Sequence, residues 1–172
     1  MDQLADGQDP AGPGQPWVTG IDHAGITVAS LDRSLAFYRD LLGLRVIEIS
    51  GPEGEDVGQA IGVRGARIRA ADLDAGDGRI IELLEYVRAA AGPVVQQPNA
   101  PGCPHVALRV LDLAGLLRRL AAAGHEPAGR PVTITGALAW EGATVVYLRD
   151  PDGALIELIQ RPDPEATAGR PG

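Results

Sequence analysis

The chain contains 172 residues and is 45% hydrophobic, which is enough apolar content for a globular domain with its own core. Its formal net charge of -8 argues against a nucleic acid or an anionic membrane surface as partner. Every basic residue is arginine, which excludes a lysine Schiff-base mechanism. The single cysteine, Cys103, excludes an intramolecular disulfide and a Cys-rich zinc motif.

The two ends of the chain are predicted to be disordered. Residues 1–17 are rich in Gly, Pro, Asp and Gln, and they carry too little apolar surface to offset the entropy of ordering. Pro, Gly and charge return in residues 162–172. No apolar run has the length of a membrane-spanning helix, and the N-terminus lacks the pattern of a signal peptide. We therefore expect a cytoplasmic protein.

Residues 18–87 predict a module of order β-α-β-β-β. Ser30 is the expected N-cap of its helix, and Gly43 is the expected stop. The expected elements, in chain order, are a strand over 18–28, a helix over 31–42, a strand over 44–50, and a hairpin of strands over 66–73 and 79–86.

Residues 88–102 are rich in Ala, Pro, Gln and Gly and predict a linker. A second β-α-β-β-β module is expected over 103–161. Its predicted elements are a strand over 103–110, a helix capped by Asp112 and stopped by Gly124, strands over 131–135 and 143–148, and a last strand that contains Glu157.

The two modules repeat an unusual pattern. The stretch DGALIELI ends in the strand of Glu157, and the stretch DGRIIELL ends in the strand of Glu82. A carboxylate inside an apolar strand is costly to bury unless it is paired or binds a metal. Each module also carries one histidine in its first strand: His105 follows His23 by 82 residues, while Glu157 follows Glu82 by 75. Two such modules, related by a pseudo-two-fold axis, would bring two histidines and two glutamates together.

These residues resemble the vicinal oxygen chelate superfamily, which includes glyoxalase I, methylmalonyl-CoA epimerase, extradiol dioxygenases and bleomycin resistance proteins. The resemblance covers about residues 18–161. Its most specific stretches run from Ile21 through Gly43 and from Tyr147 through Glu157. It implies an α+β fold in which two tandem βαβββ modules form a curved mixed sheet around a metal-binding cleft.

The resemblance also implies a ligand set. The metal ligands would be His23, Glu82, His105 and Glu157, in the middle of four strands. Extradiol dioxygenases use two histidines and one carboxylate, so the carboxylate at Glu82 favours the lyase and isomerase branch. Relatives that only bind bleomycin typically lack the set. The competing interpretation is two core histidines and two carboxylates in salt bridges with arginine.

Two imidazoles and two carboxylates suit Ni, Co, Zn, Mn or Fe, and the identity of the ion stays open. Neighbouring oxygens of a substrate could chelate the ion, which would make a C–H next to the carbonyl acidic. Glu157 and Glu82 are then the candidate catalytic bases. Arg109 shares the strand face of His105 and is a candidate for binding a substrate carboxylate or phosphate, although an ion pair with a strand neighbour is the competing role.

The sequence therefore predicts a divalent-metal-dependent lyase or isomerase of the glyoxalase or acyl-CoA epimerase type. It would abstract a proton alpha to a metal-chelated carbonyl of a small-molecule substrate. The alternatives are an Fe(II) extradiol-type dioxygenase and a small-molecule binding or resistance protein. The residues allow a complete site within one chain, and the resemblance implies a homodimer.

Overall fold

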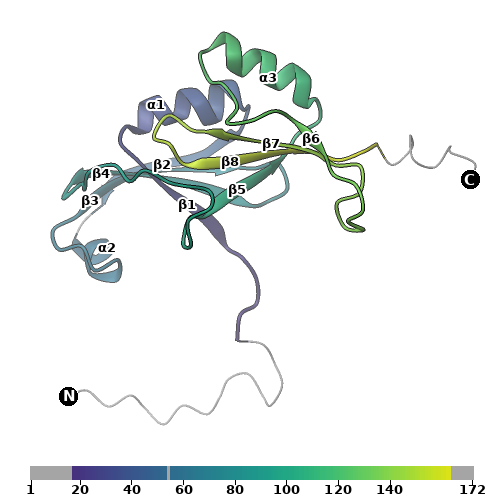
Figure 1. Ribbon diagram of the computed structural model, residues 1–172. Coiled ribbons are helices and arrows are strands. Elements are labelled where there is room, and N and C mark those ends of the chain that lie inside the picture. The colour runs from purple at the N-terminus through teal and green to yellow at the C-terminus, as the bar shows by residue number, and fades with distance from the viewer. Residues whose placement is uncertain (1–16, 54, 164–172) are drawn as a thin grey trace, which may run out of the picture.

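The structure is a computed structural model and describes residues 17–53 and 55–163. The tails predicted over 1–17 and 162–172 lie outside the described residues, apart from Trp17, Pro162 and Asp163. Two four-stranded sheets and a small number of helices make up the described chain (Figure 1).

The first sheet has the order β1-β4-β3-β2, in which β1 runs parallel to β4 and the other pairs are antiparallel. Its strands are β1 (His23–Val28), β2 (Arg45–Glu53), β3 (Arg67–Asp74) and β4 (Ile80–Arg88). The helical segments of this half are α1 (Leu31–Leu35), the π-helix η1 (Ala36–Leu41) and α2 (Glu55–Ala60).

The second sheet repeats this topology with the order β5-β8-β7-β6, and β5 runs parallel to β8. Its elements are β5 (His105–Arg109), α3 (Leu113–Ala122), β6 (Val132–Thr133), β7 (Thr144–Arg149) and β8 (Leu155–Gln160). The predicted tandem βαβββ fold of the α+β class is therefore confirmed. The two modules form two separate sheets.

The first helix differs from its prediction in one respect. After Leu35 it widens into the π-helix η1, in which the N–H of Leu42 donates to the carbonyl of Phe37 at 2.9 Å. From the first helical residue to the glycine that ends the helix, this module has one residue more than the second. The wider turn accommodates the extra residue. As a result, the adjacent rings of Phe37 and Tyr38 are both buried.

One hydrophobic core joins the two modules. Leu31, Leu35 and Tyr38 from the first helix belong to the same buried cluster as Leu148 and Leu158 from the second sheet. In Figure 1, α1 and α3 lie together on one side of both sheets. Because the helices cover the inward-facing aliphatic residues of both sheets, the opposite sheet faces remain open to solvent. The exposed positions of β1 and β5 lie on those open faces.

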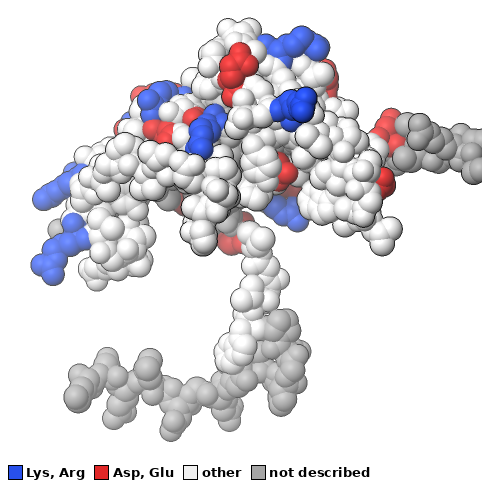
Figure 2. All heavy atoms as spheres, viewed as in Figure 1, with Lys and Arg blue, Asp and Glu red and all other residues white. Residues whose placement is uncertain are grey.

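The first strand begins at His23, later than the sequence pattern predicts. Its partner β4 begins at Ile80, which is paired with His23, so the residues before His23 have no neighbouring strand. Among the helices in the described part of the chain, none is long and apolar enough to cross a membrane. On the face shown in Figure 2, acidic and basic side chains are interspersed and form no large patch of one sign.

Candidate functional site

The first histidine–glutamate pair lies on the open face of the first sheet. His23 Nε2 lies 3.3 Å from Glu82 Oε2, and both side chains are part-exposed, at 45% and 28%. The register of β1 and β4 pairs Gly25 with Glu82. A Cβ at Gly25 would lie 3.7 Å from the Glu82 carboxylate, so glycine leaves open space beside that oxygen.

The second pair has the same geometry on the second sheet. His105 Nε2 lies 3.3 Å from Glu157 Oε2, and the His105 side chain is 44% exposed. The register of β5 and β8 pairs Ala107 with Glu157, as Gly25 is paired with Glu82 in the first module. The duplicated pattern in the sequence thus corresponds to a duplicated contact between an imidazole and a carboxylate.

A single chain does not bring the two pairs together. Within residues 17–53 and 55–163, no three His, Cys, Asp or Glu side chains gather closely enough to hold one metal ion. The reason lies in the packing: the modules share the core beneath their helices, and each sheet carries its own pair on its own open face. The structure therefore shows two separate pairs of one imidazole and one carboxylate, and we refer to each pair as a half-site.

Tyr147 belongs to the second half-site. Its hydroxyl lies 3.3 Å from His105 Nε2, and the two rings meet edge to face with centroids 5.2 Å apart. Burial raises the pKa of Tyr147, and the neighbouring Glu157 carboxylate raises it further. The sequence pattern suggests only a core or cavity-wall role for this residue. Tyr147 reaches the half-site because it is the cross-strand neighbour of Glu157. That pairing depends on the register of β7 and β8, which the sequence pattern does not reveal.

Asp72 occupies the matching position in the first half-site. It is the cross-strand partner of Glu82, as Tyr147 is of Glu157. Its charge contributes to the raised pKa of His23. The largest cause of that raised pKa is the hydrogen bond between His23 Nδ1 and the Asp22 carboxylate at 2.9 Å, and the charge of Glu82 adds to it. The two half-sites therefore differ in their third polar group.

Arg109, the candidate substrate-binding residue, pairs with a carboxylate of the other module. Its Nη2 donates to Asp77 Oδ2 at 3.0 Å. Asp77 lies in the turn between β3 and β4, and its other hydrogen-bonding partner is Arg79. This ion pair differs from the expected alternative, a pair with a strand neighbour, because the partner comes from the first module.

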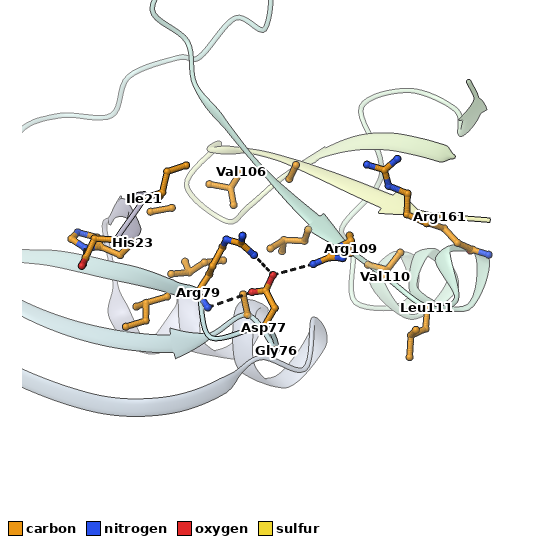
Figure 3. Close-up of a pocket in the computed structure, with 18 of the residues that line it drawn as sticks. Ile21, His23, Gly76, Asp77, Arg79, Val106, Arg109, Val110, Leu111 and Arg161 are labelled. Carbon is orange, nitrogen blue, oxygen red and sulfur yellow. Dashed lines mark hydrogen bonds and ion pairs between the residues drawn. The ribbon is translucent and has the colours of Figure 1, made fainter. Parts of the chain in front are cut away.

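A cavity of about 1040 Å³ separates the edges of the two modules at this point. Figure 3 shows Asp77 between Arg79 and Arg109, with His23 and Ile21 on the opposite side of the cavity. His105, Glu82 and Glu157 are not among its lining residues. The cavity thus borders the first half-site through His23 alone.

Two βαβββ modules, each with a His–Glu pair on its open sheet face, define the chain as a duplicated α+β protein with paired polar half-sites. The model of the Glyoxalase/Bleomycin resistance protein/Dioxygenase superfamily matches residues 20–158. The chain belongs to this superfamily.

Relatives with named activities support this membership. The chain is 30% identical over 156 residues to a 2-epi-5-epi-valiolone epimerase of an Actinomyces species, covering 88% of this chain and 84% of that protein. It is 29% identical to a probable lactoylglutathione lyase of Vibrio cholerae, covering 88% and 96%. A solved glyoxalase family protein from Bacillus cereus is similar with a TM-score of 0.76 and 25% identity, covering 87% of this chain and 99% of that one.

Proposed function

We propose that this protein is a divalent-metal-dependent lyase or isomerase of the glyoxalase or acyl-CoA epimerase type. The observation that carries the proposal is the repeated contact at 3.3 Å between an imidazole nitrogen and a carboxylate oxygen, once in each module. Named relatives include both a lyase and an epimerase. A cytoplasmic location and the identity of the metal remain predictions.

The donor set suits a divalent ion. Each half-site offers one imidazole nitrogen and one carboxylate oxygen that face each other, so both atoms can bind one ion without rearrangement of the strands. His23, Glu82, His105 and Glu157 would hold it. A bound ion supplies Lewis-acid stabilisation of the negative charge that develops on a substrate carbonyl oxygen.

The chain's own carboxylates would move the proton. Glu157 is the more enclosed of the two, with 14% of its side chain exposed against 28% for Glu82. Lower exposure reduces competition from water for the carboxylate oxygens. A general base in this position contributes about 10²–10⁴ in rate. One base on each side of the substrate carbon would support either a proton shift or an epimerisation.

We infer further that the complete site is shared between two copies of the chain. The two half-sites of one chain lie on separate sheets and do not form a cluster. A homodimer in which the first sheet of one copy faces the second sheet of its partner would assemble all four ligands twice. Two equivalent sites related by a two-fold axis would result.

The experiment is solvent deuterium exchange, screened over 2-oxoaldehyde–thiol adducts and 2-methyl acyl-CoA thioesters with added Ni, Co, Mn or Zn. We expect Glu157→Gln to abolish exchange and His105→Ala to lower metal affinity by at least about tenfold. Glu85→Gln is the matched control. Glu85 lies on the same β4 strand as Glu82, but it is paired with Arg69 at 3.0 Å, so this variant should keep exchange.

Full metal occupancy and turnover in both site variants would refute the assignment. Purified protein that neither contains nor binds a divalent ion would favour the small-molecule binding protein instead.

A second candidate is an Fe(II) extradiol-type dioxygenase that uses His23, His105 and Glu157. The observation that favours it is the Tyr147 hydroxyl 3.3 Å from His105 Nε2, because such sites recruit a further Tyr or His for acid–base chemistry. Oxygen uptake on a catechol by the iron-loaded protein would support this candidate. Exchange without oxygen uptake would exclude it.

A further inference from the structure

The internal repeat allows the two junctions between the modules to be compared side chain by side chain. At one junction the turn between β7 and β8 closes onto the first helix. Asp152 accepts a hydrogen bond from the backbone N–H of Ala29 at 3.1 Å and pairs with Arg33. Next to it, the buried Asp150 accepts a hydrogen bond from the Tyr38 hydroxyl at 3.0 Å. Polar contacts fill this junction.

The opposite junction lacks the closing side chains. The repeat offsets of 82 and 75 residues identify the equivalent positions. Gly115 stands at the position of the helix arginine and Ala75 at that of the buried carboxylate. The turn aspartate is retained as Asp77. Ala75 and Asp77 both line the cavity of about 1040 Å³ at this junction, where alanine leaves the space that a carboxylate side chain fills at the other junction.

Arginines gather at one part of this cavity. Asp77 accepts hydrogen bonds from both Arg79 and Arg109, so one carboxylate neutralises only one of two cationic charges. Each guanidinium has five N–H donors, and within residues 17–53 and 55–163 the side-chain hydrogen bonds of Arg79 and Arg109 go to Asp77. Arg161 also lines the cavity, and its guanidinium lies 4.2 Å from the centroid of the Trp140 ring. This stacking restricts the orientation of the guanidinium.

The rest of the lining is largely apolar and open. Leu111 and Ile21 line the cavity and are 100% and 83% exposed, so their aliphatic surface is accessible to a ligand there. Asp22 and Asp163 also line it, and Asp22 is hydrogen-bonded to His23. The cavity therefore offers aliphatic walls, an arginine pair and, beside His23, access to the first half-site.

We propose that this cavity binds the anionic end of the substrate, a carboxylate or phosphate carried on an apolar body, through Arg109 and Arg79. The inference rests on the proposed function for the other end of that substrate, which would reach the half-site of His23 and Glu82. Asp77 brings the two guanidinium groups to one place, and with one carboxylate against two cations the group keeps a net positive charge that attracts an oxyanion.

The position of His23 relates the two ends of such a substrate. His23 lines the same cavity as Arg79 and Arg109, so one molecule in the cavity can contact all three. The substrate class is therefore an oxygen-chelating carbonyl compound with an anionic group on the same molecule. Short dicarbonyl compounds without such a group would leave the cavity empty.

The test measures binding to the full-length, metal-free protein, so it does not depend on catalysis. The probes are 3-phenylpropionate and phenyl phosphate, with 3-phenyl-1-propanol as the uncharged counterpart, and the arginine side-chain N–H signals are followed by NMR. We expect both anions to shift the signals of Arg79 and Arg109. Arg109→Gln should weaken anion binding at least about tenfold. Arg118→Gln, an exposed position of α3 outside the cavity, should bind as the wild type does.

Equal anion affinity in wild type and Arg109→Gln would overturn the proposal, and so would an alcohol that binds as tightly as the anions. The result is separable from the proposed function. Anion binding without metal-dependent exchange would remove the lyase or isomerase assignment and leave this site standing. Metal-dependent exchange without anion binding at Arg109 would support the lyase or isomerase assignment and remove this anion site.

Discussion

Asp150 is a buried carboxylate at the closed junction between the modules. It is 5% exposed, and it accepts hydrogen bonds from the Tyr38 hydroxyl and from the backbone N–H groups of Asp152 and Ala154. Burial raises its pKa above the ordinary value of 3.8, although these hydrogen bonds oppose the shift. A single side chain thus links the π-helix of the first module to the turn of the second.

The raised pKa predicts a pH-dependent contribution to stability. A carboxyl group with a raised folded-state pKa binds its proton more tightly in the folded state. Its stabilising contribution is therefore present below the unfolded-state value and is lost as the pH rises through the folded-state pKa. Asp150→Asn removes this titration. We expect the wild type to lose stability relative to Asp150→Asn as the pH rises from about 4 to about 7.

Urea unfolding of both proteins across this range provides the measurement. Parallel stability curves, or a wild type that gains stability relative to the variant with rising pH, would contradict the prediction.

The linker between the modules is held in place although it contains no helix or strand over 89–104. Gln96 makes the contacts: its side-chain oxygen accepts a hydrogen bond from the N–H of Leu155 at 3.3 Å, and its backbone carbonyl accepts one from Arg149 at 2.8 Å. Leu155 is the first residue of β8, so the linker caps the strand that carries Glu157.

Gln96→Ala should therefore lower the free energy of unfolding by about 1–2 kcal/mol, because the part-buried N–H of Leu155 loses its acceptor. The matched control is Gln97→Ala, at the next and exposed position of the same linker, which should change stability by less than about 0.5 kcal/mol. Chemical denaturation of the three proteins compares them directly. Equal losses of unfolding free energy in both variants would show that the side-chain contact of Gln96 with Leu155 does not stabilise the fold.

At the scale of the whole molecule, the arrangement of the half-sites is the central feature. The shared core fixes the two sheets relative to each other, and their open faces carry one His–Glu pair each. Aliphatic side chains are exposed on the first sheet as well, with Ile47 at 49% and Ile49 at 51%. Exposed apolar positions on β2, at the opposite edge of this sheet from β1, are consistent with the proposed association of two copies.

Subunit complementation tests that association. One variant carries His23→Ala and Glu82→Gln, and the other carries His105→Ala and Glu157→Gln. Each is expected to be inactive alone. After unfolding and refolding together, half of the dimers are hybrids, and each hybrid has one intact site of two, so activity should return to about a quarter of the wild-type value.

Both variants carry one His→Ala and one Glu→Gln substitution and therefore have equal masses, so one of them is labelled with ¹⁵N to make hybrid dimers detectable by native mass spectrometry. No recovery of activity in a sample that contains hybrid dimers would exclude a site shared between chains. Refolded wild type under the same conditions provides the reference value.

Much of the fold was predictable because duplication doubles every local signal. The strands and helices follow from the spacing of apolar residues and from caps such as Ser30 and Asp112, both of which accept a hydrogen bond from the first turn. The π-helix was not predictable in the same way. One inserted residue leaves the apolar spacing of a helix nearly unchanged, and only packing in the shared core decides how it is accommodated.

The candidate site was also predictable only in part. The sequence by itself determined that each module carries one histidine and one glutamate in apolar strands, and which residues share a face with each of them, because alternation along a strand is a local property. Only the tertiary structure decided that these residues meet within a module and not across the chain, since that depends on which faces the common core covers. The roles of Tyr147, Asp77 and the cavity beside Arg109 were likewise decided by strand register and by the contact between modules. Both of these join residues that lie far apart in the sequence.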